Sequence, residues 1–250
     1  MLTWHKTMEG ALAAAAKRKK PILSLRLLGR LDQELSCANS RFFKKWLYPD
    51  RRVAKLLEDR FVLHWQSVRP VPIITVDFGD GRKLVTTITG NSVHLVLDQR
   101  GRPIDALPGL FTADAFVRLA SAAADLAETL PDAARLAGWH RARLARLADV
   151  PENMLPRGFH VPHMKPSARE AGALAMTKMM VERPLINAVM LPVVEEDSRQ
   201  NEFVLHRQIH QHFASGAVET ADELAAWIYE EVFLMPADDP WLGLRQGDEL

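Results

Sequence analysis

The chain has 250 residues and a formal net charge of +1, with 48% hydrophobic and 25% charged residues. This composition is typical of a globular protein, excludes a disordered chain, and gives no reason to expect a nucleic-acid partner. No stretch approaches the roughly 20 apolar residues of a membrane span, and residues 1–20 lack the apolar core of a secretion signal, so we expect a cytoplasmic protein without a membrane partner.

The first part of the chain alternates helix and strand patterns. Thr7 can cap a helix, and the apolar run 22–28 predicts a strand buried on both faces. A second helix begins near Cys37, and a third is indicated over residues 51–60 by apolar residues at helical spacing. Residues 61–68 then predict another strand, which gives the order strand, helix, strand.

The next part is richer in strand signals. Residues 71–90 contain two β-rich runs around a glycine-containing turn and predict a hairpin. Residues 92–98 and 103–109 predict two more strands, and an amphipathic helix begins after Thr112. We therefore expect a mixed α/β domain over residues 1–130. No strand pattern follows, so an all-helical C-terminal region is expected over residues 131–250.

Several segments, taken in order, resemble the thioredoxin-fold superfamily. They are Trp4, "KPIL" at 20–23, the cysteine before a helix, and "VLDQRGRPIDALPG" at 96–109. The resemblance covers residues 4–130 and implies a three-layer domain with a mixed sheet and a reactive thiol at a helix start. The end "FLMPADDPWLGL", at 233–244, is similar to the tail of large bacterial thioredoxin-like proteins and implies no reaction.

The cysteine segment reads Cys-Ala-Asn-Ser and matches the family's Cys-x-x-Cys motif at its first position only. Cys37 takes the place of the first cysteine, and Ser40 replaces the second. Because a serine cannot resolve a mixed disulfide, the resemblance implies monothiol exchange, with glutathione or a client protein thiol as the resolving partner. Ser92 takes the place of the family's cis-proline; a non-proline cis bond costs about 2.5–4 kcal/mol, so we expect a trans bond. Asn39 and Ser92 are the candidate substrate-binding residues.

The local chemistry of Cys37 agrees with a reactive role. The single cysteine cannot form an internal disulfide, as expected in a reducing compartment. Helix N-termini carry partial positive charge and amide donors that stabilise a thiolate. We predict Cys37 as the nucleophile, Ser40 as a hydrogen-bond donor to its thiolate, and Arg41 as a stabilising charge, with no cofactor beyond glutathione as a co-substrate. The alternative is a buried thiol in a domain that has lost catalysis and serves as a binding module.

Other candidate groups lie in the C-terminal half. Glu202, His206 and His210 stand at i, i+4 spacing, so on a helix they share a face that could bind metal or neighbouring polar groups. The polar-face interpretation is favoured, and no metal site is predicted. His160 and His163 are two further histidines in a proline-rich loop, and Trp241 is expected to dock the C-terminal tail. No pattern specifies an oligomeric state.

Overall fold

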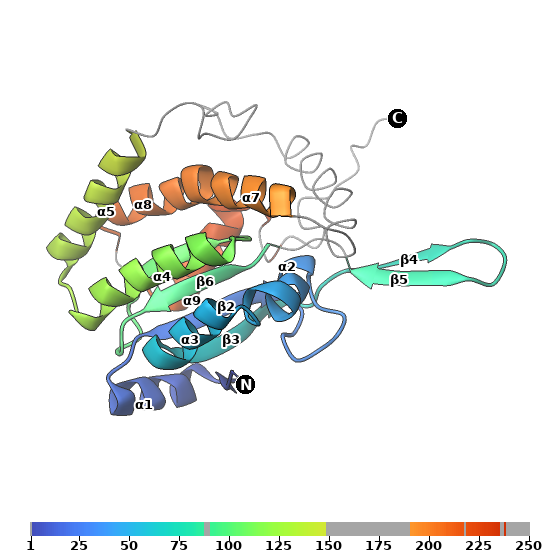
Figure 1. Cartoon of the computed structure of the whole chain (residues 1–250), viewed down its shortest axis with the longest axis horizontal. Helices are drawn as coiled ribbons and strands as arrows, with labels where there is room; N and C mark the ends of the chain where they lie inside the picture. The colour runs from blue at the N-terminus through green and yellow to red at the C-terminus, as the bar shows by residue number, and fades with distance from the viewer. Residues whose placement is uncertain (1, 88–90, 149–190, 218, 236–237, 239–250) are drawn as a thin grey trace.

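The structure is a computed structural model, shown in Figure 1, that describes residues 2–87, 91–148, 191–217, 219–235 and 238. Its centre is a five-stranded mixed sheet in the order β1-β3-β2-β6-β7. β1, β3 and β2 run parallel, β6 runs antiparallel to β2, and β7 runs antiparallel to β6 and so in the same direction as β2. The strands are β1 (Trp4–His5), β2 (Ile22–Leu28), β3 (Val62–Arg69), β6 (Val93–Leu97) and β7 (Pro103–Pro108). The expected mixed α/β architecture is thus confirmed.

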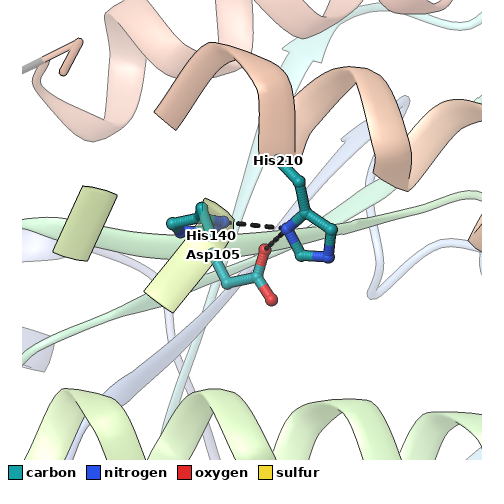
Figure 2. A group of neighbouring side chains, drawn as sticks. All are labelled: Asp105, His140 and His210. Atoms are coloured by element: carbon teal, nitrogen blue, oxygen red, sulfur yellow. Dashed lines mark hydrogen bonds and ion pairs between the residues drawn. The ribbon is translucent and has the colours of Figure 1, made fainter. Parts of the chain in front are cut away.

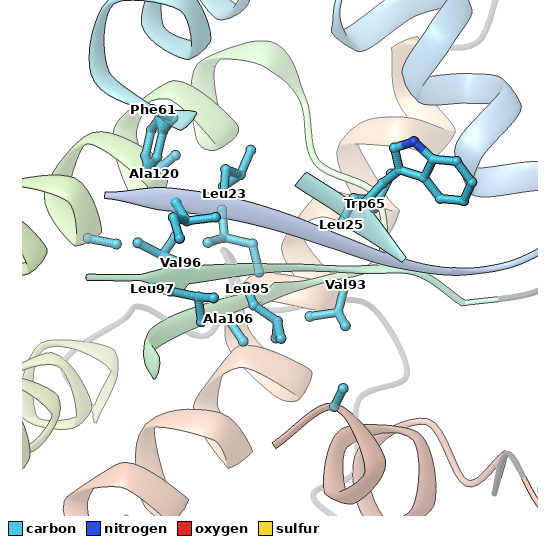
Figure 3. Close-up of a cluster of buried hydrophobic side chains, with 14 of the residues drawn as sticks. Leu23, Leu25, Phe61, Trp65, Val93, Leu95, Val96, Leu97, Ala106 and Ala120 are labelled. Carbon is cyan, nitrogen blue, oxygen red and sulfur yellow. The ribbon is translucent and has the colours of Figure 1, made fainter. Parts of the chain in front are cut away.

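The central strand β2 is buried at every residue, as its apolar run predicts. It pairs with parallel β3 on one side and with antiparallel β6 on the other, where Leu23 faces Val96 across the ladder. Figure 3 shows Leu23 and Val96 packed near Phe61 and Ala120 on one side of the sheet. A strand with no exposed face requires other elements to cover both sides of the sheet.

The helices of the first part begin at the caps that the sequence indicates. Thr7 accepts from the Gly10 amide at the start of α1 (Met8–Arg18), and the Thr112 hydroxyl accepts from the Ala115 amide at the start of α4 (Ala113–Glu128). Each bond satisfies one of the amides that a helix start leaves without a partner. Asp50 caps α3 (Arg51–Arg60) in the same way. The helix that begins after the cysteine comprises α2 (Ala38–Phe42) and a π-helical continuation, η1 (Phe43–Leu47).

The predicted hairpin is present as an antiparallel pair, β4 (Ile73–Asp77) and β5 (Lys83–Thr87). It forms a sheet of its own and extends from the body of the molecule in Figure 1. We call these residues, 73–87, the β4–β5 arm. Its tip is closed by the ion pair of Asp77 and Lys83, whose charged atoms lie 3.2 Å apart.

The C-terminal helices complete the fold by packing on the sheet. Arg26 of β2 is buried and forms an ion pair of 2.9 Å with Asp222, while the Tyr229 hydroxyl donates to the Asn91 carbonyl at 2.7 Å. These helices are α5 (Ala133–Ala148), α7 (Leu191–Gln200), η3 (Asn201–Leu205), α8 (His206–Ala214), α9 (Ala221–Trp227) and η4 (Ile228–Val232).

The described helices after residue 130 share one hydrophobic cluster with the sheet. Ile209, Leu224 and Tyr229 are fully buried in the same cluster as Leu95. Within the described part of residues 131–250 there is no strand, in agreement with the expected helical region. The domain boundary at residue 130 stays a prediction. Among the described helices, none has both the length and the apolar character needed to cross a membrane.

Candidate functional site around Cys37

Cys37 is the N-cap residue of α2, at the carboxyl end of the central strand β2. Its amide donates to the carbonyl of Leu28, the last residue of β2, at 3.3 Å. The predicted position at a helix start is therefore confirmed. The side chain, however, is 0% exposed and belongs to the hydrophobic core cluster.

Two serine hydroxyls contact the sulfur. The Cys37 Sγ donates to Ser40 Oγ at 3.4 Å and lies 3.2 Å from Ser92 Oγ. Ser40 Oγ donates its own hydrogen to the Cys37 carbonyl at 2.8 Å, as serines in the first helical turn commonly do. This arrangement differs from the predicted donation by Ser40 to the sulfur. Ser92, 55 positions away in the chain, is the hydroxyl that can donate to the sulfur.

Ser92 is held at the start of β6 by backbone contacts. Its carbonyl accepts from the Gly109 amide at 2.8 Å, just past the end of β7. Every peptide bond of the described residues is trans, including the bond between Asn91 and Ser92, as the sequence predicts. The fold thus places Ser92 against the cysteine.

Arg41 connects the cysteine segment to the β4–β5 arm. Its Nη1 atom donates to the Ser36 carbonyl at 2.8 Å and to Thr87 Oγ1 at 2.5 Å. Thr87, at the end of β5, donates to the same Ser36 carbonyl at 2.9 Å. These bonds give Arg41 a positioning role at the base of the arm, in addition to the charge that it brings near the helix start.

Two polar residues close to Cys37 in the chain, Ser36 and Asn39, have buried side-chain atoms without hydrogen-bond partners among the described residues. Asn39 is 1% exposed, and among the described residues neither its Nδ2 nor its Oδ1 atom has a hydrogen-bond partner. The buried Ser36 hydroxyl also lacks one. Each such group costs about 1–3 kcal/mol and therefore calls for an explanation, such as a role in binding.

An aromatic cluster packs against the helix that begins after Cys37, which we call the cysteine helix. The Tyr48 hydroxyl and His94 Nε2 are 2.8 Å apart, and the Phe43 ring centroid lies 4.6 Å from that of His94. Burial lowers the pKa of His94 to about 3 and raises the pKa of Tyr48 well above its usual value. Both rings are therefore neutral at pH 7. Burial, followed by the charge of Arg41, lowers the pKa of Lys44.

A second polar group of side chains lies between β7, α5 and α8. We call Asp105, His140, His206 and His210 the histidine cluster; all four are buried. Figure 2 shows His210 in contact with both His140 and Asp105. His206 Nε2 lies 2.8 Å from Asp105 Oδ1, and the Nδ1 atoms of His140 and His210 lie 2.8 Å apart.

The histidine cluster differs from the predicted helix face. His206 and His210 belong to it, but the Glu202 carboxylate binds Arg118 of α4 at 2.6 and 2.8 Å instead. Glu202 lies in the π-helical segment η3, whose wider turn interrupts the i, i+4 pattern. The sequence analysis did not identify Asp105 or His140. The available signal for Asp105 was a single carboxylate in the otherwise apolar strand β7.

Burial controls ionisation in the histidine cluster. It lowers the pKa of His210 to about 2, with the neighbouring charge of His206 acting in the same direction. Burial also lowers the pKa of His140. For Asp105, burial would raise the pKa, but the electrostatic interaction and the hydrogen bond with His206 hold it below its usual value. The Asp105 carboxylate is thus a buried negative charge.

The remaining candidates, His160, His163 and Trp241, lie outside the described residues. Comparisons of the chain with protein-family models, with curated proteins and with solved structures returned no match.

Proposed function

We propose that residues 4–130 form a thioredoxin-like domain. The support is the strand order β1-β3-β2-β6-β7, in which β6 runs opposite to its neighbours β2 and β7, and a cysteine at the start of the helix after β2. The contact between Cys37 and Ser92 agrees with this assignment, because the family's cis-proline position lies beside the thiol. The single cysteine fits a cytoplasmic, reducing location.

The function that the geometry supports best is binding of a partner polypeptide, with Cys37 as a buried structural thiol. The observation that carries this proposal is the β4–β5 arm. Ile73 is 57% exposed and Val85 is 48% exposed. Val85 pairs with Thr75, and alternate residues of a strand share a face, so Ile73, Thr75 and Val85 lie on one exposed face.

The physical reason for a partner is the weakness of the arm alone. A two-stranded hairpin is marginally stable in water, and its outer edges leave backbone groups that can pair with another chain. Phe78 at the tip is 57% exposed as well. A partner that covers these apolar side chains would stabilise the arm, and the base of the arm is already fixed by Arg41 and Thr87.

We expect the double substitution Ile73→Ser and Val85→Ser to lower partner recovery at least about tenfold while leaving the melting temperature nearly unchanged, because exposed substitutions usually alter stability by about 0.5 kcal/mol or less. The measurement is quantitative mass spectrometry of proteins retained from a source-cell lysate by the immobilised full chain. Thr75→Ser, on the same face, is the matched control.

The binding proposal requires that the same partner be retained by wild type, Thr75→Ser and Cys37→Ala. Equal recovery by the double variant would contradict a role for the arm. Loss of the partner in Cys37→Ala alone would favour a thiol-dependent function instead.

Monothiol exchange at Cys37 is the second candidate. It is favoured by the sulfur at a helix start, by the Ser92 hydroxyl 3.2 Å away, and by the unpartnered Asn39 amide, which a bound substrate could satisfy. In such a reaction the Cys37 thiolate attacks the glutathione sulfur of a mixed disulfide on a client. The sulfur–sulfur bond breaks, the client leaves as a thiolate, and a second glutathione thiolate then regenerates Cys37.

Because Cys37 is fully buried, we expect iodoacetamide to modify it at least about 100-fold more slowly in the native chain than in urea, as modification requires local opening. Incubation with glutathione disulfide is expected to give no mixed disulfide in the native chain by mass spectrometry. Rapid alkylation of Cys37 in the native chain, together with glutathione addition that is lost in Ser92→Ala, would contradict a structural role for this thiol. It would support monothiol exchange instead.

A further inference from the structure

The histidine cluster has the composition and spacing of a transition-metal site. His140 and His210 each offer an Nδ1 atom and Asp105 a carboxylate oxygen, and these three atoms all lie within 4.8 Å of one another. The residues come from three different elements, α5, α8 and β7. We propose that Asp105, His140 and His210 bind one zinc ion, with His206 orienting the Asp105 carboxylate.

The distances between the proposed ligand atoms agree with the size of a zinc ion. In a tetrahedral site with zinc–nitrogen bonds of about 2.0–2.1 Å, neighbouring ligand atoms lie about 3.3 Å apart. The two Nδ1 atoms are separated by 2.8 Å, and His210 Nδ1 lies 3.9 Å from Asp105 Oδ1. The observed separations fall on both sides of the required value, so side-chain shifts of about half an ångström would admit the ion.

The hydrogen-bond partner of its other ring nitrogen favours metal binding through Nδ1 of His140. Its other nitrogen, Nε2, lies 2.9 Å from the Ile104 carbonyl. A carbonyl can only accept, so Nε2 carries the hydrogen and the neutral ring presents a lone pair at Nδ1. A ligating histidine usually donates its second N–H to a carbonyl or carboxylate in this way.

Asp105 is similarly oriented by its neighbours. Its Oδ1 atom accepts from the Ala106 amide at 2.9 Å and lies 2.8 Å from His206 Nε2. These contacts restrict the rotation of the carboxylate and hold it close to His140 and His210.

The choice of zinc follows from the donor set and its burial. Imidazole nitrogens with one carboxylate suit zinc, whereas calcium and magnesium prefer oxygen ligands. All three ligand residues are buried, and they would fill three of the four positions of a tetrahedral zinc site. A bound ion would fasten α5 and α8 to the edge strand β7 of the sheet.

The test begins with the full chain expressed in zinc-supplemented medium. We expect metal analysis to find about one zinc per chain, and zinc titration of the chelator-treated chain to raise its melting temperature. Cobalt in place of zinc is expected to give visible absorption bands from a nitrogen and oxygen ligand set. A chain that holds no zinc after expression and binds none on titration would overturn the proposal.

Variants identify the ligands. Asp105→Asn, His140→Gln and His210→Gln are each expected to lower zinc affinity at least about 100-fold, and His206→Gln about 10- to 100-fold, because His206 contacts the ligand Asp105 and not the ion. His212→Gln, also on α8 but bonded to Glu219, is the matched control and should keep wild-type affinity. Circular dichroism shows which variants fold. Retained affinity in folded Asp105→Asn, His140→Gln and His210→Gln would overturn the assignment and leave a hydrogen-bonded structural cluster.

Discussion

Replacement of Phe43 by alanine is expected to lower the free energy of unfolding by about 3–5 kcal/mol, the usual cost of removing a buried aromatic ring. Phe43 is fully buried, and its ring centroid lies 5.8 Å from that of Tyr48 and 4.6 Å from that of His94. The substitution leaves a cavity between η1 and the sheet that these neighbours cannot readily fill. Equilibrium denaturation by urea measures the change.

The matched control is Phe78→Ala at the tip of the β4–β5 arm. Phe78 is highly exposed, so its removal should change the free energy of unfolding by about 0.5 kcal/mol or less. Similar losses for Phe43→Ala and Phe78→Ala would contradict the described packing of the cysteine helix. A large loss for Phe43 alone would show that this helix is held by the aromatic cluster.

Acidification from pH 7 to pH 5 is expected to destabilise the chain through His94. Burial lowers the pKa of His94 to about 3 in the folded state, whereas an unfolded histidine has a pKa of about 6.5. Below pH 6.5 the unfolded chain binds the additional proton, so stability is present above that pH and is lost as the pH falls toward 3. At 1.36 kcal/mol per pKa unit, the full loss from this one group is about 5 kcal/mol.

Urea denaturation at a series of pH values measures this dependence, and two variants separate the histidines. His94→Gln and His64→Gln should each flatten the profile between pH 7 and pH 5, and His94→Gln should do so more than His64→Gln only below about pH 5, because burial, followed by the charge of Arg26, lowers the pKa of His64 only to about 4. If the free energy of unfolding of His94→Gln changed between pH 7 and pH 5 as much as that of wild type, a neutral, buried His94 could not be the cause of the pH dependence. Tyr48→Phe tests the hydroxyl that pairs with the ring.

Much of the fold could be predicted because its signals are local. The apolar run 22–28 specifies a strand buried on both faces, and β2 has those bounds. The caps Thr7, Asp50 and Thr112 depend on a side chain and an amide two or three residues later, and all three are present. The position of Cys37 at a helix start belongs to the same class of local feature.

The composition of the two polar sites could be predicted only in part. Cys37, Ser40 and Ser92 do meet, but the hydrogen of Ser40 goes to a backbone carbonyl. The i, i+4 spacing grouped Glu202 with His206, yet a π-helical segment and Arg118 on α4 separate them. Side-chain partners that come from distant elements leave no periodic signal in the chain.

Amino-acid order determined the strands, the helix starts and the single thiol, because these depend on hydrophobic period and on bonds within a few residues. Tertiary packing decided that Cys37 is buried, that Ser92 contacts its sulfur, and that Asp105 meets His140 and His210. Burial and long-range contact depend on how the C-terminal helices cover the sheet. That arrangement brings together residues as far apart in the sequence as Asp105 and His210. No local sequence pattern indicates their contact.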